Sequence, residues 1–148
     1  MINLFVAFVV AVVSSFMAGQ IFHHEFGDRI SLDDQQRFAS MYIKTIQRRR
    51  SLLFIFDCRS VAHVDPAAIW EHIRVFHSLR QLNRRKVASF SILMQSNRLS
   101  AVLNMVFQMV PPSAPYLVTD DPRKAISHAC RYWSTIGELS PEECFEWP

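Results

Sequence analysis

Strand-like and helix-like segments alternate along most of the chain, and this alternation constrains the fold more than any other feature. Short apolar runs rich in β-branched and aromatic residues are followed by longer segments whose apolar residues recur at helical spacing. The expected strands are Phe5–Val13, Gln20–Phe26, Ser51–Phe56, Val87–Met94 and Tyr116–Thr119. The order β-β-α-β-α-β-α-β-α predicts an α/β fold with a mixed, largely parallel sheet of about five strands and four crossover helices.

Start and stop signals define the four expected helices. Asp65-Pro66 and Asp121-Pro122 each place a capping residue before a proline, which is favoured at the first helical position because its missing N–H costs nothing there. Ser31 offers a further cap. The helices are expected over about Leu32–Arg49, from Pro66 to the basic run Arg84–Lys86, from Gln95–Asn97 to just before Pro111-Pro112, and from Pro122 through Trp133.

The N-terminal run has two interpretations. Residues 2–19 carry no charge and are long enough for a membrane span or the apolar part of a signal peptide. However, no positive charge precedes the run, and Phe5–Val13 has the β-branched and aromatic composition of a strand buried on both faces. We favour a buried first strand and keep the membrane or signal segment as the alternative.

The length of 148 residues suits one domain with a single core. We expect this domain to span residues 1–137, because Gly137 ends the last helix, and residues 138–148 to form a short acidic tail. The three cysteines are widely spaced without a CxxC pair, which favours the cytoplasm or another reducing compartment over a disulfide framework. Membrane attachment through the N-terminus is the alternative location.

The basic residues concentrate in two runs, Arg48–Arg50 and Arg84–Lys86, within a net charge of only +3. Both runs fall where a helix is expected to end, and cations there interact favourably with the last helical carbonyls. No nucleic-acid-binding motif accompanies them. The sequence therefore favours solvated helix ends, and no nucleic-acid partner is expected.

A segment in the middle of the chain resembles a known family. The stretch Phe54-Ile55-Phe56-Asp57-Cys58-Arg59-Ser60-Val61-Ala62-His63-Val64-Asp65-Pro66-Ala67-Ala68-Ile69 is similar, without a gap, to the strand, turn and helix start of STAS domains, which occur in anti-sigma-factor antagonists such as SpoIIAA and in sulphate-transporter tails. The stretches Ser96–Phe107, Pro111–Pro115 and Asp120–Ala125 resemble a divergent STAS-like branch of bacteria, algae and large DNA viruses. The resemblance covers about Gln20 to Trp133.

The resemblance implies a binding scaffold without enzyme activity and without a cofactor. Switching members of the family are phosphorylated on a serine at the start of this helix, where the matching pair here is Pro66-Ala67 and carries no hydroxyl. The contact surface implied by the resemblance surrounds the segment from Asp57 to Glu71. The residues expected to contact a protein partner are Asp57, Arg59, Ser60, His63, Asp65, Trp70 and Glu71, with Trp147 of the tail as a further aromatic anchor.

The histidines do not have the spacing of a metal site. His23 and His24 are adjacent on an expected strand and should point to opposite faces, and His72 and His77 should lie on different sides of a helix. Packing or surface roles are therefore favoured, and no metal is expected.

Catalytic and nucleotide motifs are also weak. Cys58 and His63 are close in sequence, but no nucleophile elbow or oxyanion loop surrounds them, so packing is the preferred role of the cysteine. With glycine only at three positions, neither GxGxxG nor a Walker sequence can occur.

A lipid ligand is the main alternative. Met94, Met105, Phe107 and Met109 cluster in one segment, and the STAS-like fold resembles in outline the CRAL-TRIO lipid-transfer fold. A stripe of this kind is more often core. The sequence therefore predicts a non-catalytic protein-interaction or structural module of a larger assembly, such as a virus particle or an organellar complex. A small lipid-binding or membrane-anchored protein is the second hypothesis.

Overall fold

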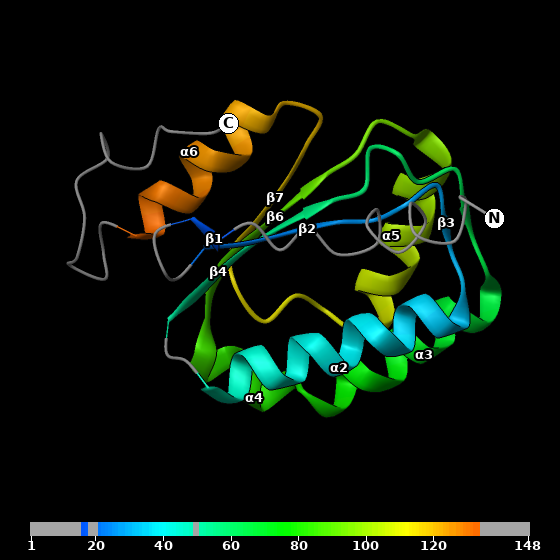
Figure 1. Cartoon of the computed structure of the whole chain (residues 1–148), viewed down its shortest axis with the longest axis horizontal. Coiled ribbons are helices and arrows are strands. Elements are labelled where there is room, and N and C mark those ends of the chain that lie inside the picture. Colours follow the sequence, from blue (N-terminus) through cyan, green and yellow to red (C-terminus); the bar gives the residue numbers. More distant parts are fainter. Residues whose placement is uncertain (1–15, 18–20, 49–50, 134–148) are drawn as a thin grey trace, which may run out of the picture.

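In the computed structural model the described residues are 16–17, 21–48 and 51–133. They form a five-stranded sheet with the order β1-β2-β4-β6-β7, flanked by helices (Figure 1). The strands are β1 (Phe16–Met17), β2 (Ile21–Glu25), β4 (Leu52–Asp57), β6 (Val87–Leu93) and β7 (Tyr116–Thr119). Strand β1 pairs antiparallel with β2, and the other pairs are parallel, so the expected mixed and largely parallel sheet is confirmed.

The helices cover the two faces of the sheet unequally. They are α2 (Leu32–Arg48), α3 (Pro66–Ser78), α4 (Arg80–Lys86), α5 (Asn97–Met109) and α6 (Pro122–Trp133). Each successive parallel strand from β2 to β7 is added on the same side of the previous one, so right-handed crossovers place α2 to α5 on one face. Helix α6 follows the last strand and packs on the opposite face (Figure 1).

Successive side chains of the strands point to opposite faces of the sheet and pack into the apolar core on each face. Phe54 of β4 packs with α2, whereas Leu53 and Ile55 pack with α6. On the α6 side Ser91 Oγ donates to the carbonyl of Ala125 over 3.3 Å, which satisfies a fully buried hydroxyl in the core. Burial on both faces explains the nearly continuous apolar sequence of β4.

The predicted capping residues behave differently from one another. Ser31 Oγ accepts the N–H of Asp34, and Asp34 Oδ2 accepts the N–H of Ser31, which makes a reciprocal cap for α2. Asp121 Oδ1 accepts the N–H of Arg123 at the start of α6. The prediction for Asp65 is wrong in one respect, because its side chain makes no capping hydrogen bond and instead binds Arg29 and His63.

Three short strands and a helix break were not expected, and one of these strands is β1 (Phe16–Met17), which follows the expected first strand Phe5–Val13 in the chain. Strands β3 (Arg29–Ile30) and β5 (His63–Val64) form a small second parallel sheet in segments for which the sequence predicted no strand. The second expected helix is broken at Leu79 into α3 and α4, which makes five helices in the described part of the chain instead of four. Ser78 Oγ donates to the carbonyl of Val75 over 2.6 Å, a local bond that competes with regular helix geometry at the break.

The expected first strand Phe5–Val13, the end of the domain at Gly137 and the tail 138–148 lie outside the described residues. Among the residues that the structure describes, no helix is long and apolar enough to cross a membrane.

Candidate functional site

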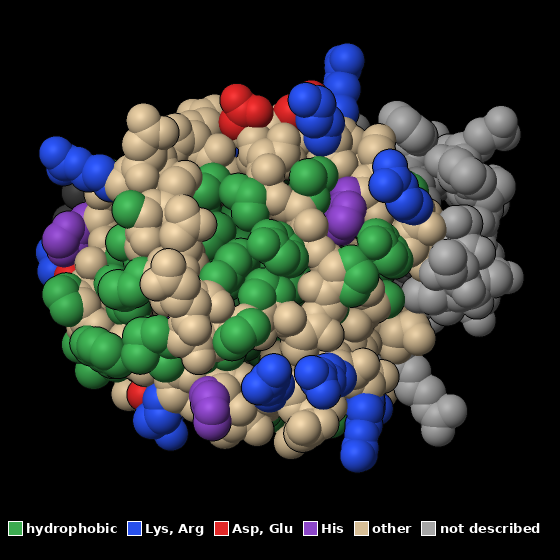
Figure 2. Space-filling view, turned by 180° about the vertical axis from the view of Figure 1, so that it is seen from behind, with side chains coloured by type: hydrophobic (Ala, Val, Ile, Leu, Met, Phe, Trp, Pro, Cys, Tyr) green, Lys and Arg blue, Asp and Glu red, His purple; other side chains and the backbone are tan. Residues whose placement is uncertain are grey.

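An apolar pocket of about 190 Å³ lies between the sheet and the helices α2 to α5. Its floor includes Phe54 and Phe56 of β4 and Phe90 of β6, and α3 and α5 contribute further apolar side chains. Seen from behind, the molecule carries a broad patch of apolar side chains bordered by Lys and Arg (Figure 2). A contiguous exposed apolar patch with a polar rim is typical of binding sites.

Aromatic rings form a continuous layer on one wall of the pocket. Tyr42 of α2 lies 4.9 Å from both Phe54 and Phe76, measured between ring centroids, and Phe38 is stacked on Phe76 at 6.3 Å. Phe56 contacts Phe38 edge-on at 5.7 Å. Aromatic pairs in these offset and edge-to-face arrangements stabilise beyond the area that they bury. The wall is therefore a packed part of the core.

A buried and a partly buried hydrogen bond connect the helices around this wall. Tyr42 Oη donates to Asn83 Oδ1 over 2.9 Å, which ties α2 to α4, and burial raises the pKa of Tyr42. Gln35 Nε2 lies 3.2 Å from His72 Nδ1 and joins α2 to α3. Because an amide nitrogen can only donate, His72 Nδ1 is the acceptor and the ring proton resides on Nε2. Burial lowers the pKa of His72 to about 4, so the ring is neutral at pH 7.

Only part of the segment proposed from the sequence as a lipid-contacting stripe faces the pocket. Met94 and Phe107 line the pocket, whereas Met105 and Met109 are exposed on α5. Pockets for drug-sized ligands usually have volumes of about 300–1,000 Å³. A volume of about 190 Å³ leaves too little room for a long acyl chain.

The predicted partner-binding residues lie at the carboxyl ends of the strands and along the first turns of α3. Asp57 is buried at the end of β4, and its carboxylate accepts hydrogen bonds from Arg59 Nε and Nη2 and from the Arg59 backbone N–H. Burial alone would raise the pKa of Asp57, but the hydrogen bonds from Arg59 outweigh it and hold the pKa below its usual value. Asp57 therefore positions Arg59 and is itself out of reach of a partner.

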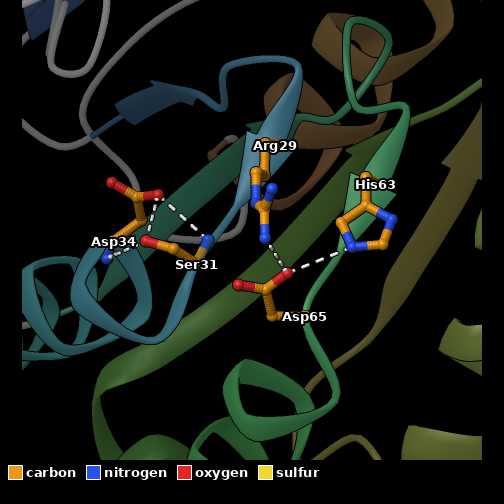
Figure 3. A network of polar contacts seen from close by, with 5 residues as sticks. All are labelled: Arg29, Ser31, Asp34, His63 and Asp65. Atoms are coloured by element: carbon orange, nitrogen blue, oxygen red, sulfur yellow. Dashed lines mark hydrogen bonds and ion pairs between the residues drawn. The ribbon is translucent and has the colours of Figure 1, made fainter.

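His63 and Asp65 converge with a residue that sequence analysis did not select (Figure 3). Asp65 Oδ1 accepts a hydrogen bond from Arg29 Nη2 at 2.8 Å and lies 3.1 Å from His63 Nε2. Pairing of β3 with β5 brings Arg29 opposite His63, although the two are 34 positions apart. No sequence signal marks strands of two residues, which explains why Arg29 was missed. The neighbouring Ser31–Asp34 cap is also visible in this view (Figure 3).

The remaining predicted residues lie along the same edge. Ser60 is exposed in the loop before β5, and Trp70 on α3 is 58% exposed. Glu71 pairs with Arg74 Nη2 at 2.6 Å, and Trp147 lies outside the described residues. The structure thus brings Asp57 to Arg59 and His63 to Asp65, and it leaves Trp70 projecting into solvent.

The two adjacent histidines point to opposite faces, as strand alternation predicts. His23 Nε2 lies 3.8 Å from Asp57 Oδ2, and His24 packs against Phe26 and Phe38. His24 Nδ1 has no hydrogen-bond partner among the described residues, and burial lowers its pKa to about 4. Within the described ranges, no three His, Cys, Asp or Glu side chains come together in a group that could hold a metal ion.

Cys58 and His63, the pair considered for nucleophilic chemistry, are engaged elsewhere. Burial raises the pKa of the Cys58 thiol to about 12, and Cys58 lines the apolar pocket. His63 binds Asp65 instead. A thiol that stays protonated at pH 7 is a poor nucleophile.

Comparisons with known proteins address the fold. No protein-family model matches the chain, and no curated protein matches it. A solved structure of an uncharacterized protein from the DUF3478 family of Shewanella loihica, which has a SpoIIAA-like fold, superposes with a TM-score of 0.59. The two sequences are 9% identical, and the match covers 78% of this chain and 90% of that chain. The chain therefore has a SpoIIAA-like, that is STAS-like, fold.

Proposed function

We propose that the protein is a non-catalytic interaction module that binds a protein partner through the surface around the start of α3. This surface, called the α3 edge below, consists of Arg29, Arg59, Ser60, His63, Trp70 and Arg74. The observation that carries the proposal is Trp70, a large aromatic side chain on α3 that is 58% exposed, together with the arginines of the α3 edge, which are exposed or half-exposed. Trp and Arg are the residue types that most often dominate binding energy at protein interfaces.

The ion pairs of the α3 edge share a common orientation. In each pair the cation is the more exposed member: the Arg29 side chain is 62% exposed against 24% for Asp65, and Arg74 is 70% exposed against 16% for Glu71. The acids lie beneath and hold the cations in place. The α3 edge therefore presents guanidinium groups around an apolar anchor, which suits a partner that has carboxylates around an apolar recess.

The absence of catalysis is supported by the state of the ionisable groups. Cys58 stays protonated, His24 is buried, His72 is half-buried, and both rings are neutral, so none of the three groups is poised as a nucleophile or proton donor near pH 7. Pro66 and Ala67, which occupy the place of the family's phosphorylated serine, are exposed at the start of α3 and carry no hydroxyl. We therefore propose constitutive binding at this point of the fold without phosphorylation.

The test is a quantitative affinity enrichment from source cells with the full-length protein, Trp70→Ala and Met109→Ala. Met109 is also an exposed apolar residue, but it lies on α5, so it controls for general stickiness. A partner of the α3 edge should be enriched by the wild type and by Met109→Ala and lost with Trp70→Ala. A second variant, Arg29→Glu, should also lose it. If every enriched protein is retained by Trp70→Ala, the proposed surface is wrong.

The second hypothesis, a lipid-binding or membrane-anchored protein, is favoured by one observation, the apolar lining of the pocket. The pocket volume argues against a long-chain lipid. The protein-interaction hypothesis is therefore preferred.

A further inference from the structure

We propose that the pocket between the sheet and α2 to α5 is a binding site for a compact apolar carboxylate, such as an arylalkanoic acid or a short-chain acid. The apolar body would occupy the pocket, and the carboxylate would pair with Arg80. This inference concerns a small ligand at a site separate from the α3 edge, so it goes beyond the proposed function and does not depend on it.

The size of the pocket is the first argument. Protein interiors are close-packed and contain few voids larger than a water molecule. A cavity of about 150 Å³ lined by Leu, Ile and Phe stays dry and accepts benzene. The pocket here measures about 190 Å³ and has walls of the same kind. It therefore has room for a single ring or a short chain.

The walls determine the chemistry of the ligand's body. Phe54, Phe76 and Phe90 present aromatic surfaces, and Val102 and Leu103 of α5 present aliphatic ones. Tyr42 is hydrogen-bonded to Asn83, and Gln35 is hydrogen-bonded to His72. These polar groups therefore do not require hydrogen bonds from a ligand. A polar or highly charged body would lose its hydration without compensation against these walls.

Charge determines the chemistry of the ligand's head. Of the described side chains that line the pocket, only Arg80 carries a formal charge, and none is acidic. Arg80 is the first residue of α4 and is exposed, so its guanidinium can reach both the pocket and solvent. No carboxylate of the described residues lies within ion-pairing distance of Arg80, whereas Arg29, Arg59 and Arg74 each have one. A single unpaired guanidinium beside an apolar pocket suits a monoanionic carboxylate, to which arginine binds in a bidentate manner.

The probe molecules are 3-phenylpropionate and its neutral amide, 3-phenylpropionamide, which share the same apolar body. Binding of each to the full-length protein is measured by isothermal titration calorimetry. The variants are Arg80→Gln and the matched control Arg84→Gln, which removes a cation from the same helix at a position that does not line the pocket. Leu103→Trp fills the pocket, and Val102→Phe serves the same purpose if the first variant does not fold.

The wild type should bind both probes and prefer the carboxylate. Arg80→Gln should weaken binding of the carboxylate by about tenfold or more, because the charge-assisted bidentate pair is lost, and leave the amide unchanged. Arg84→Gln should change neither, and the filled pocket should bind neither. The proposal is overturned if the wild type binds neither probe, if Arg80→Gln and Arg84→Gln weaken the carboxylate equally, or if a folded variant with the filled pocket still binds.

Discussion

The guanidinium of Arg59 donates two hydrogen bonds to the buried carboxylate of Asp57, two residues before it, with Nη2 to Oδ2 at 2.6 Å and Nε to Oδ1 at 3.0 Å. The pair closes the loop that leaves β4, because the Arg59 N–H also donates to Asp57 Oδ1. His23 of β2 lies 3.8 Å from the same carboxylate. With these contacts, the buried carboxylate of Asp57 has a structural role and fixes the position of Arg59 in the α3 edge.

Arg59→Gln should destabilise the protein by about 2 kcal/mol near neutral pH, because the buried carboxylate loses its counter-charge. The folded-state pKa of Asp57 lies below 3.8, its usual value, so the stabilisation is present above that pH and is lost as the pH falls through the folded pKa. Urea denaturation at several pH values measures this. The matched control is Arg74→Gln, whose exposed pair with Glu71 should contribute no measurable stability. An equal loss in both variants would contradict the anchoring role.

His24→Phe should make the protein more resistant to mild acid. His24 is buried and its pKa is lowered to about 4, so the unfolded chain takes up a proton below its usual pKa of 6.5 before the folded chain does. The free energy of unfolding of the wild type should therefore fall between these pH values, and the variant should gain about 1–2 kcal/mol at about pH 5 relative to its effect at about pH 7.5. Chemical denaturation at the two pH values measures the difference. A gain that is the same at both would show that His24 does not titrate in this way.

Tyr42 and Asn83 should be energetically coupled. Each side chain is buried, and the hydrogen bond between them is 2.9 Å long, so removing one partner leaves the other without its bond. Tyr42→Phe and Asn83→Ala should each cost about 1–3 kcal/mol, and a double-mutant cycle should give a coupling of about 1 kcal/mol. Additive effects would mean that the bond does not connect α2 to α4 energetically.

Cys58 should react slowly with iodoacetamide in the folded protein. Its pKa is raised from 9.0 to about 12, which lowers the thiolate fraction at about pH 8 by roughly a thousandfold. The rate is measured by mass spectrometry in a Cys130→Ala, Cys144→Ala background, with the same protein unfolded in urea as the control. A rate equal to that of the unfolded chain would contradict the protonated, buried thiol and reopen the hypothesis of a nucleophile.

The secondary structure from Gln20 onward followed closely from local patterns. β2, β4, β6 and β7 all lie where apolar runs predicted them, and α6 begins at Pro122 as the Asp-Pro pair indicated. Side-chain periodicity is a property of short segments and the handedness of crossovers follows a general rule, so both can be predicted from a single sequence. The break at Leu79 was not predicted because no proline or glycine marks it in the sequence.

The candidate binding surface was also predicted only in part from the sequence. The segment from Asp57 to Glu71 could be selected from its motif alone, but the sequence could not show that Asp57 is buried beneath Arg59 or that Asp65 turns away from its helix to bind Arg29 and His63. The contact of Asp65 with Arg29 depends on the pairing of β3 with β5, which joins residues distant in sequence.

The pocket was decided by tertiary structure alone. Its lining comes from the sheet and the helices α2 to α5, and each of these segments has the ordinary apolar pattern of a core element. Local patterns determine which face of a helix is buried. How closely α3 and α5 approach the sheet, and hence whether a void remains beside Arg80, depends on the packing of all of them together.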